Sequence, residues 1–170
     1  GFIIRRDDGF YDITYLGALC IGASFSLFPP LYGKGVEVVT YSGTSRVSET
    51  SIPTFFESGF LLNFDSIVDC ILNAMGSKEI VATGLETAST HPPIIVREML
   101  SNAVVHQDFS KNGGRILVEC FPDRLEMYND GNLGIDVDRI VDYEPRPQNR
   151  HFVELLSRFW VAKAMGRVST

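Results

Sequence analysis

The segment from residue 92 to residue 134 constrains the fold most, because its apolar residues change from a helical period to a strand period. Pro92 and Pro93 suit the first turn of a helix, which the sequence predicts to continue to about Gln107. After the glycine-containing turn at 111–114, apolar residues alternate at 115–121, and Ile116, Val118 and Cys120 share one face. A Pro-Asp turn and a return strand at 124–128 follow. The segment therefore predicts a helix followed by a β-hairpin.

The preceding residues predict a smaller α/β segment. We expect strands at 2–4 and 36–41, and a polar, turn-rich stretch at 42–52. Thr14 is a suitable N-cap for a helix at 15–21 that ends at Gly22. Helical spacing at 64–75 predicts a second helix with Asp65 in its first turn. A last helix is expected at about 149–160.

A boundary is predicted in the polar, proline-containing stretch at 77–93, which also holds a short predicted strand at 79–82. The chain is thus divided into residues 1–78 and residues 79–170. The fold class expected from these elements is α+β, with a two-layer α/β sandwich in the second part.

Composition excludes several classes of function. The net charge of −6 argues against a chain that grips a nucleic-acid backbone by itself. Cys20, Cys70 and Cys120 form no C-x-x-C pair and no cluster with histidine, which excludes the common zinc patterns and indicates buried thiols in a reducing cytoplasm. No apolar run is long enough to span a membrane, and no signal peptide is recognised. A Walker-type phosphate loop is also missing, so a helicase motor is not expected.

The helix at 94–107 carries a polar stripe. At about 100° per residue, Glu98, Asn102 and His106 lie within roughly 80° of one another. Apolar residues flank the stripe, and the side best suited to solvent is expected around Arg97 and Ser101. An acid, an amide and an imidazole directed at an apolar environment must be paired or meet a ligand. Two interpretations stay open, namely a satisfied internal network and a cleft that holds a polar ligand.

These residues resemble a known family. Glu98-x-x-x-Asn102-Ala103-x-x-His106 is similar to the first motif of the GHKL (Bergerat) ATPases, and the closer resemblance is to the RecG-like ATP-binding family of bacterial regulators. The resemblance continues through the glycines at 113–114, the hairpin motif Phe-Pro-Asp-Arg-Leu-Glu at 121–126 and the loop Asn-Asp-Gly-Asn-Leu at 129–133. It covers about residues 92–170. The upstream residues are similar to the end of a Schlafen-type AlbA-like DNA-binding domain.

The resemblance implies a site for ATP and Mg²⁺. Asn102 matches the asparagine whose amide oxygen coordinates Mg²⁺, an ion that prefers hard oxygen ligands. Glu98 matches the glutamate that activates the attacking water and would be the catalytic residue, although a structural hydrogen bond to a neighbouring strand or loop is its alternative role. His106 is assigned to the same site without a defined role, and a core or capping histidine is its alternative.

The loop after the hairpin matches the adenine-binding part of the family. Asn129 occupies the place of an aspartate that accepts a hydrogen bond from the adenine amino group, and Asp130 is its neighbour. An amide oxygen can accept the same hydrogen bond. Gly131 and Gly134 are assigned to the nucleotide with them. The departure from aspartate puts base specificity in question, and an ordinary turn is the alternative reading of this loop.

The last part of the chain extends the resemblance. Residues 142–150 occupy the place of a mobile lid, in which Arg146 and Arg150 either approach phosphate or are solvated surface charges. Residues 166–170 match the start of a glycine motif that contacts phosphates.

The function expected from the resemblance is an ATP-binding module of a bacterial, cytoplasmic transcriptional regulator. DNA would be bound by parts of the protein outside this chain, and a homodimer is a further expectation. The alternative is a degenerate fold that binds no nucleotide and serves as a dimerisation or interaction scaffold. An active ATPase would need Glu98 as its base.

Overall fold

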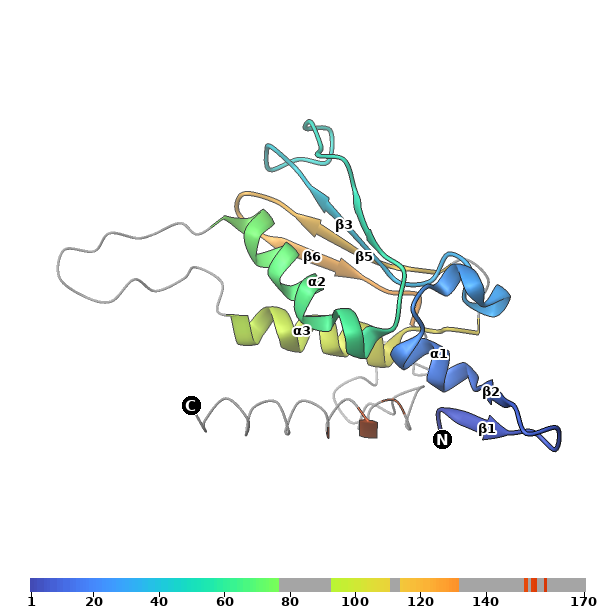
Figure 1. The fold of residues 1–170 in the computed structure, drawn as a ribbon. Helices are drawn as coiled ribbons and strands as arrows, with labels where there is room; N and C mark the ends of the chain where they lie inside the picture. Colours follow the sequence, from blue (N-terminus) through green and yellow to red (C-terminus); the bar gives the residue numbers. More distant parts are fainter. Residues whose placement is uncertain (77–92, 111–113, 132–151, 153, 156–157, 159–170) are drawn as a thin grey trace, which may run out of the picture.

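The computed structural model describes residues 1–76, 93–110 and 114–131, together with Phe152, Glu154, Leu155 and Arg158. These residues form a mixed α+β structure with two sheets (Figure 1). The predicted strand at 79–82, the lid at 142–150 with Arg146 and Arg150, the glycine motif at 166–170 and Gly134 lie outside the described residues, as does most of the helix expected at 149–160.

A four-stranded sheet forms the centre of the structure, in the order β4-β3-β5-β6. Its strands are β3 (Val36–Thr40), β4 (Thr54–Phe56), β5 (Ile116–Cys120) and β6 (Leu125–Tyr128). β3 pairs parallel with β5, with Val38 opposite Val118, whereas β4 and β6 are antiparallel to their neighbours. Strand β4 was not predicted, because it has only three residues, follows a proline and shows no longer alternating pattern. It lies at the edge of the sheet.

One face of the central sheet is covered by the helices α2 (Phe60–Met75) and α3 (Pro93–His106) (Figure 1). Helix α1 (Tyr15–Ile21) packs on α2, and two short 3-10 helices follow it, η1 (Phe25–Leu27) and η2 (Pro29–Leu31). A separate two-stranded sheet joins β1 (Ile3–Arg5) to β2 (Tyr11–Ile13) and lies beyond α1 from the central sheet (Figure 1).

Local sequence signals account for most element boundaries. The Thr14 side chain accepts a hydrogen bond from the Gly17 N–H at 2.9 Å, and α1 ends at Gly22, so both predicted ends are confirmed. Helix α2 begins at Phe60, four residues before the prediction (64 − 60). The prediction that Asp65 lies in its first turn is therefore wrong. Asp65 instead accepts a hydrogen bond from Arg97 of α3 at 2.7 Å, which ties the two helices together.

The core runs through both halves of the sequence. Ile116, Val118 and Cys120 all face the helices, as the alternating pattern predicts, and they meet Val36 and Val38 of β3. Four phenylalanines extend this core toward α1, with ring centroids 5.7–6.3 Å apart in four pairs: Phe25, Phe60, Phe109 and Phe152. Residues on either side of the boundary predicted at 77–93, which itself is largely outside the described residues, thus belong to one sheet and one core.

Candidate functional site

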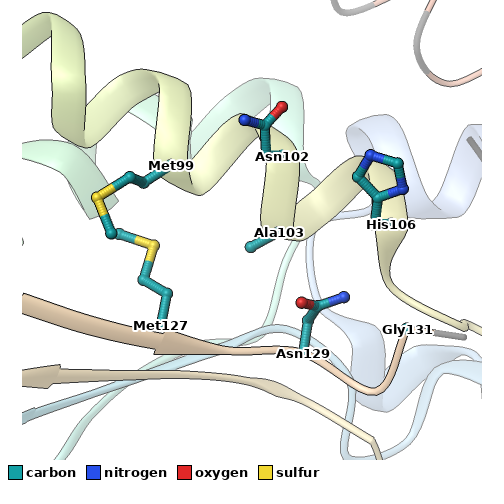
Figure 2. A pocket seen from close by; sticks show the side chains of 7 residues that line it. All are labelled: Met99, Asn102, Ala103, His106, Met127, Asn129 and Gly131. Atoms are coloured by element: carbon teal, nitrogen blue, oxygen red, sulfur yellow. The ribbon is translucent and has the colours of Figure 1, made fainter. Parts of the chain in front are cut away.

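A pocket lies between α3 and β6 (Figure 2). Its volume is about 450 Å³, which falls in the range of small-molecule sites. The lining residues come from the two elements and from the loop after β6: Met99, Asn102, Ala103, His106, Met127, Asn129 and Gly131. The structure therefore brings together four of the residues that the sequence assigned to a nucleotide: Asn102, His106, Asn129 and Gly131.

The pocket has an apolar part and a polar part. Figure 2 shows the Met99 and Met127 side chains directed toward each other across the gap between α3 and β6, with Ala103 beside them. The Asn129 amide projects from the end of β6 toward α3, and the Asn102 amide is directed away from β6 in this view. The pocket therefore offers an apolar surface with one amide at its end and a second amide on its outer side.

The polar stripe of α3 is more exposed than the sequence pattern indicated. Val96, Leu100, Ala103 and Val104 are buried against the sheet and α2, so the opposite side of the helix, with Glu98 and Asn102, is exposed. The prediction that the polar stripe is directed at a largely apolar environment therefore does not hold for the exposed Glu98 and Asn102. Arg97 and Ser101, expected to face solvent, are half-buried, and Arg97 contacts α2. The reason is that α3 packs on two partners, and α2 covers the side that carries Arg97.

Glu98 and Asp130 lie apart from the pocket lining. Glu98 is one helical turn before Asn102 in α3, and Asp130 is exposed between the two lining residues Asn129 and Gly131. The backbone of Asp130 holds the loop after β6 in place. Its N–H donates to the Gln107 side chain at 3.0 Å, and its carbonyl accepts from the Asp108 N–H at 3.3 Å.

A buried amide holds the loop that forms one end of the pocket. Gln107 is fully buried, accepts a hydrogen bond from the Asp130 N–H and donates one to the Gly114 carbonyl at 3.3 Å. A side chain at Gly131 would place its Cβ 2.5 Å from the His106 carbonyl oxygen, so the loop approaches the end of α3 as closely as only glycine permits. The pairing of Tyr128 with Leu117 before Asn129 and the contacts of Asp130 and Gly131 after it thus fix the backbone on both sides of Asn129.

A buried lysine interacts electrostatically with the same loop. Lys34, just before β3, is 1% exposed. Burial lowers the pKa of Lys34, and the carboxylates of Asp108 and Asp130 act in the opposite direction. These carboxylates favour the charged ammonium of Lys34, so a lysine from the first half of the chain interacts electrostatically with Asp130 of the loop at 129–131.

Sequence reasoning missed Met127, Ala103, Gln107 and Lys34. The alternation of β6 does indicate that Leu125 and Met127 share the helix-facing side, and this was the available signal for Met127. No local pattern distinguishes Gln107 or Lys34 from surface residues, because their burial depends on strands that are distant in the sequence.

The described residues do not contain a group of three or more His, Cys, Asp or Glu side chains that could hold a metal ion. Burial raises the pKa values of Cys20 and Cys120 to about 12, so these thiols stay protonated and behave as small apolar residues of the core. Among the described segments, no helix has both the length and the apolar character needed to cross a membrane.

Comparisons of the chain with protein-family models, with curated proteins and with solved structures find no match.

Proposed function

We propose that this chain is a nucleotide-binding module of the GHKL type, which holds Mg-ATP between α3 and β6. It would belong to a bacterial, cytoplasmic regulator whose DNA-binding portion lies outside this chain. One observation carries the proposal: Asn102, His106, Asn129 and Gly131, assigned to a nucleotide from the sequence resemblance, line a single pocket. These residues come from two segments that lie more than twenty positions apart in the sequence.

The chemistry of the lining residues fits the proposed ligand. A purine ring is flat and apolar on its faces, and Met99, Met127 and Ala103 supply an adaptable apolar surface. The Asn129 amide can accept a hydrogen bond from an exocyclic amino group at the edge of the base. The Asn102 amide supplies a hard oxygen for Mg²⁺, and an exposed position leaves room for phosphates and water to complete the coordination.

Hydrolysis is a separate question from binding. Glu98 precedes Asn102 by one helical turn and is exposed, which leaves its carboxylate accessible to a water molecule. We assign Glu98 as the base only if the chain turns over ATP. In that case Glu98→Gln should abolish turnover and retain Mg-ATP binding, because glutamine keeps the shape and removes the proton acceptor. Unaltered turnover in this variant would remove Glu98 from the catalytic role.

Calorimetric titration of Mg-ATP into the chain tests the binding proposal. We expect saturable binding that needs Mg²⁺ and is lost in Asn102→Ala. Asn73→Ala is the matched control, because Asn73 is also an exposed amide on a helix but lies on α2, away from the pocket. Equal binding by the wild-type chain and Asn102→Ala would refute the role of Asn102.

A second candidate function is a scaffold that binds no nucleotide. Two observations favour it, namely the amide of Asn129 in place of the expected carboxylate and the position of Glu98 outside the pocket lining. Absence of Mg-ATP binding in the folded chain, shown folded by a cooperative urea transition, would support this candidate over the first.

A further inference from the structure

Within the described part of the chain, the two strands of the β1-β2 hairpin pair only with each other, and they expose apolar side chains. All six residues of the two strands are exposed, and Ile3, Ile4 and Tyr11 are 56%, 61% and 60% exposed. A two-stranded sheet is marginally stable in water, and three or more strands are needed for independent stability. An exposed strand edge with apolar side chains is also a template for pairing with another chain.

The hairpin is fixed firmly to the rest of the molecule. The Thr14 hydroxyl donates to the Gly1 carbonyl at 2.9 Å and accepts from the Gly17 N–H at 2.9 Å. A Cβ on Gly17 would lie 2.2 Å from the Phe2 carbonyl oxygen, so the residue directly before β1 is in backbone contact with α1. The hairpin therefore presents its edges in a defined orientation.

The hydrogen bonds within the hairpin show which backbone groups face outward. The Thr14 N–H donates to the Phe2 carbonyl at 2.8 Å, and the Arg6 N–H donates to the Phe10 carbonyl at 2.8 Å. Phe2 and Arg6 therefore direct backbone groups toward β2. Ile4 lies midway between them and is paired with Asp12, so its backbone groups also point toward β2. Because successive backbone groups alternate in direction, the N–H and C=O groups of Ile3 and Arg5 point to the free edge of β1. Within the described residues, no strand pairs with that edge.

We propose that β1 pairs antiparallel with β1 of a second copy of this chain, with Ile4 on the two-fold axis. Ile3 of one copy would lie opposite Arg5 of the other, a pair whose outward groups can exchange both hydrogen bonds. The result is a four-stranded sheet in the order β2-β1-β1-β2. The contact is isologous, because each copy supplies the same strand.

Charge selects the β1 edge over the β2 edge. The same two-fold pairing through β2 would place Asp12 of each copy directly opposite its equivalent, and like charges in that position are destabilising. Through β1 the residue on the axis is Ile4, and no like charges stand opposite each other. The charge of Arg6, directly after β1, is compensated within its own hairpin by Asp8 at 2.9 Å and Asp12 at 3.6 Å, so Arg6 does not oppose pairing through β1.

This inference does not depend on nucleotide binding, since the hairpin shares no residue with the pocket. Sedimentation equilibrium of the whole chain, without nucleotide, is the first test. We expect a reversible monomer–dimer equilibrium. A monomer at every soluble concentration would overturn the proposal.

Two proline variants identify the edge. Ile3→Pro removes the outward N–H of β1, which eliminates one intermolecular hydrogen bond for each copy, and we expect the dimer to dissociate about tenfold more readily. Tyr11→Pro is the matched control, because it removes an outward N–H from β2 instead. Equal weakening by both variants, or by neither, would exclude pairing through β1.

Crosslinking locates the axis. In the proposed pairing the two Ile4 residues form a non-hydrogen-bonded pair, with Cα atoms about 4.5 Å apart, so Ile4→Cys should form an intermolecular disulfide on mild oxidation. Asp12→Cys, on the other strand of the same hairpin, should not. The wild-type chain controls for Cys70, the half-buried native thiol. A dimer that crosslinks through Asp12→Cys but not through Ile4→Cys would refute the proposed axis.

Discussion

At the scale of the residue, the side chain of Gln107 fixes the position of the loop at 129–131. This side chain accepts a hydrogen bond from the Asp130 N–H and donates one to the Gly114 carbonyl, and so joins two segments that are distant in the sequence. An amide is suited to this place, since it offers one acceptor and two donors at a fixed spacing. Unsatisfied polar groups in a buried site destabilise a fold, so the contribution of Gln107 is measurable.

We predict that Gln107→Leu lowers the free energy of unfolding by about 1–3 kcal/mol, because leucine fills the space but leaves both backbone groups unpaired. Urea denaturation measures the change. The matched control is Asn73→Leu, an amide exchanged for leucine at an exposed helical position, for which we expect a change within about 0.5 kcal/mol. Similar effects of the two exchanges would show that the Gln107 hydrogen bonds contribute little.

A second prediction at this scale concerns Asn129 and the choice of base. A carboxylate only accepts hydrogen bonds, whereas the amide of Asn129 accepts and donates. If the pocket binds nucleotide, the wild-type chain should tolerate guanine as well as adenine, and Asn129→Asp should shift the ratio of affinities toward ATP over GTP by roughly tenfold. Competition between the two nucleotides in calorimetric titrations measures this ratio. The control is Asp130→Asn, the reverse exchange at the exposed neighbouring residue, which should leave the ratio of affinities unchanged. An equal ratio in wild type and Asn129→Asp would show that Asn129 does not contact the base.

Residues of this kind separate what the sequence could predict from what it could not. Asn102 and Asn129 were identified because a motif carries their identity and spacing, and the structure places both at one pocket. The exposure of Glu98 was not predictable, because it depends on which faces of α3 are covered by α2 and by the sheet. The burial of Gln107 and Lys34 depends on segments that are distant in the sequence. A helical period gives the angle between side chains but not the number of partners around the helix.

At the scale of the element, the outer face of the sheet is organised by charge. Arg46 reaches from the loop 42–50 to Glu119 of β5 at 2.8 Å and to Glu126 of β6 at 2.6 Å, and the Tyr41 hydroxyl donates to Glu119 at 2.6 Å. Glu119 is 4% exposed although the alternating pattern placed it on the face away from the core. The stretch at 42–52, which the sequence predicted to be polar and turn-rich, therefore covers this end of the sheet and buries a carboxylate there.

This cluster predicts a pH dependence. Hydrogen bonds from Tyr128 and Arg124 lower the pKa of Glu126 below its ordinary value of 4.5. A carboxyl group with a lowered pKa stabilises the fold above its unfolded pKa, and this contribution is lost as pH falls through the folded pKa. We expect Glu126→Gln to unfold at lower urea concentration than wild type at neutral pH, and the difference to shrink as the pH falls below 4.5 and through the lowered pKa of folded Glu126.

The control for this experiment is Glu49→Gln, an exposed glutamate in the same loop that makes no ion pair among the described residues. It should show no difference from wild type at any pH. A Glu126→Gln difference that persists unchanged into acid would mean that its charge is not the source of the effect.

At the scale of the whole molecule, the parallel pairing of β3 with β5 decides how the chain unfolds. Parallel strands need a crossover connection, and here it includes β4, α2, residues 77–92 and α3. The apolar faces of all these described elements meet in one core. A sequence pattern shows where each strand begins but not which distant strand it pairs with. The division into residues 1–78 and 79–170 therefore rested on the polar stretch and on the family resemblance of the two parts.

The single core predicts a single cooperative transition. Leu100 of α3 is fully buried, so Leu100→Ala should cost about 2–5 kcal/mol through lost burial and a residual cavity. Hydrogen exchange measured by mass spectrometry should then show protection lost together in β3 and α2, before residue 78, and in β5, after it. Leu62→Ala is the control, because Leu62 is 60% exposed on α2 and its removal leaves no cavity. If exchange in β3 kept its wild-type protection while β5 lost it, the two halves would be separate folding units, and the shared sheet would be a docking surface between domains instead of a common core.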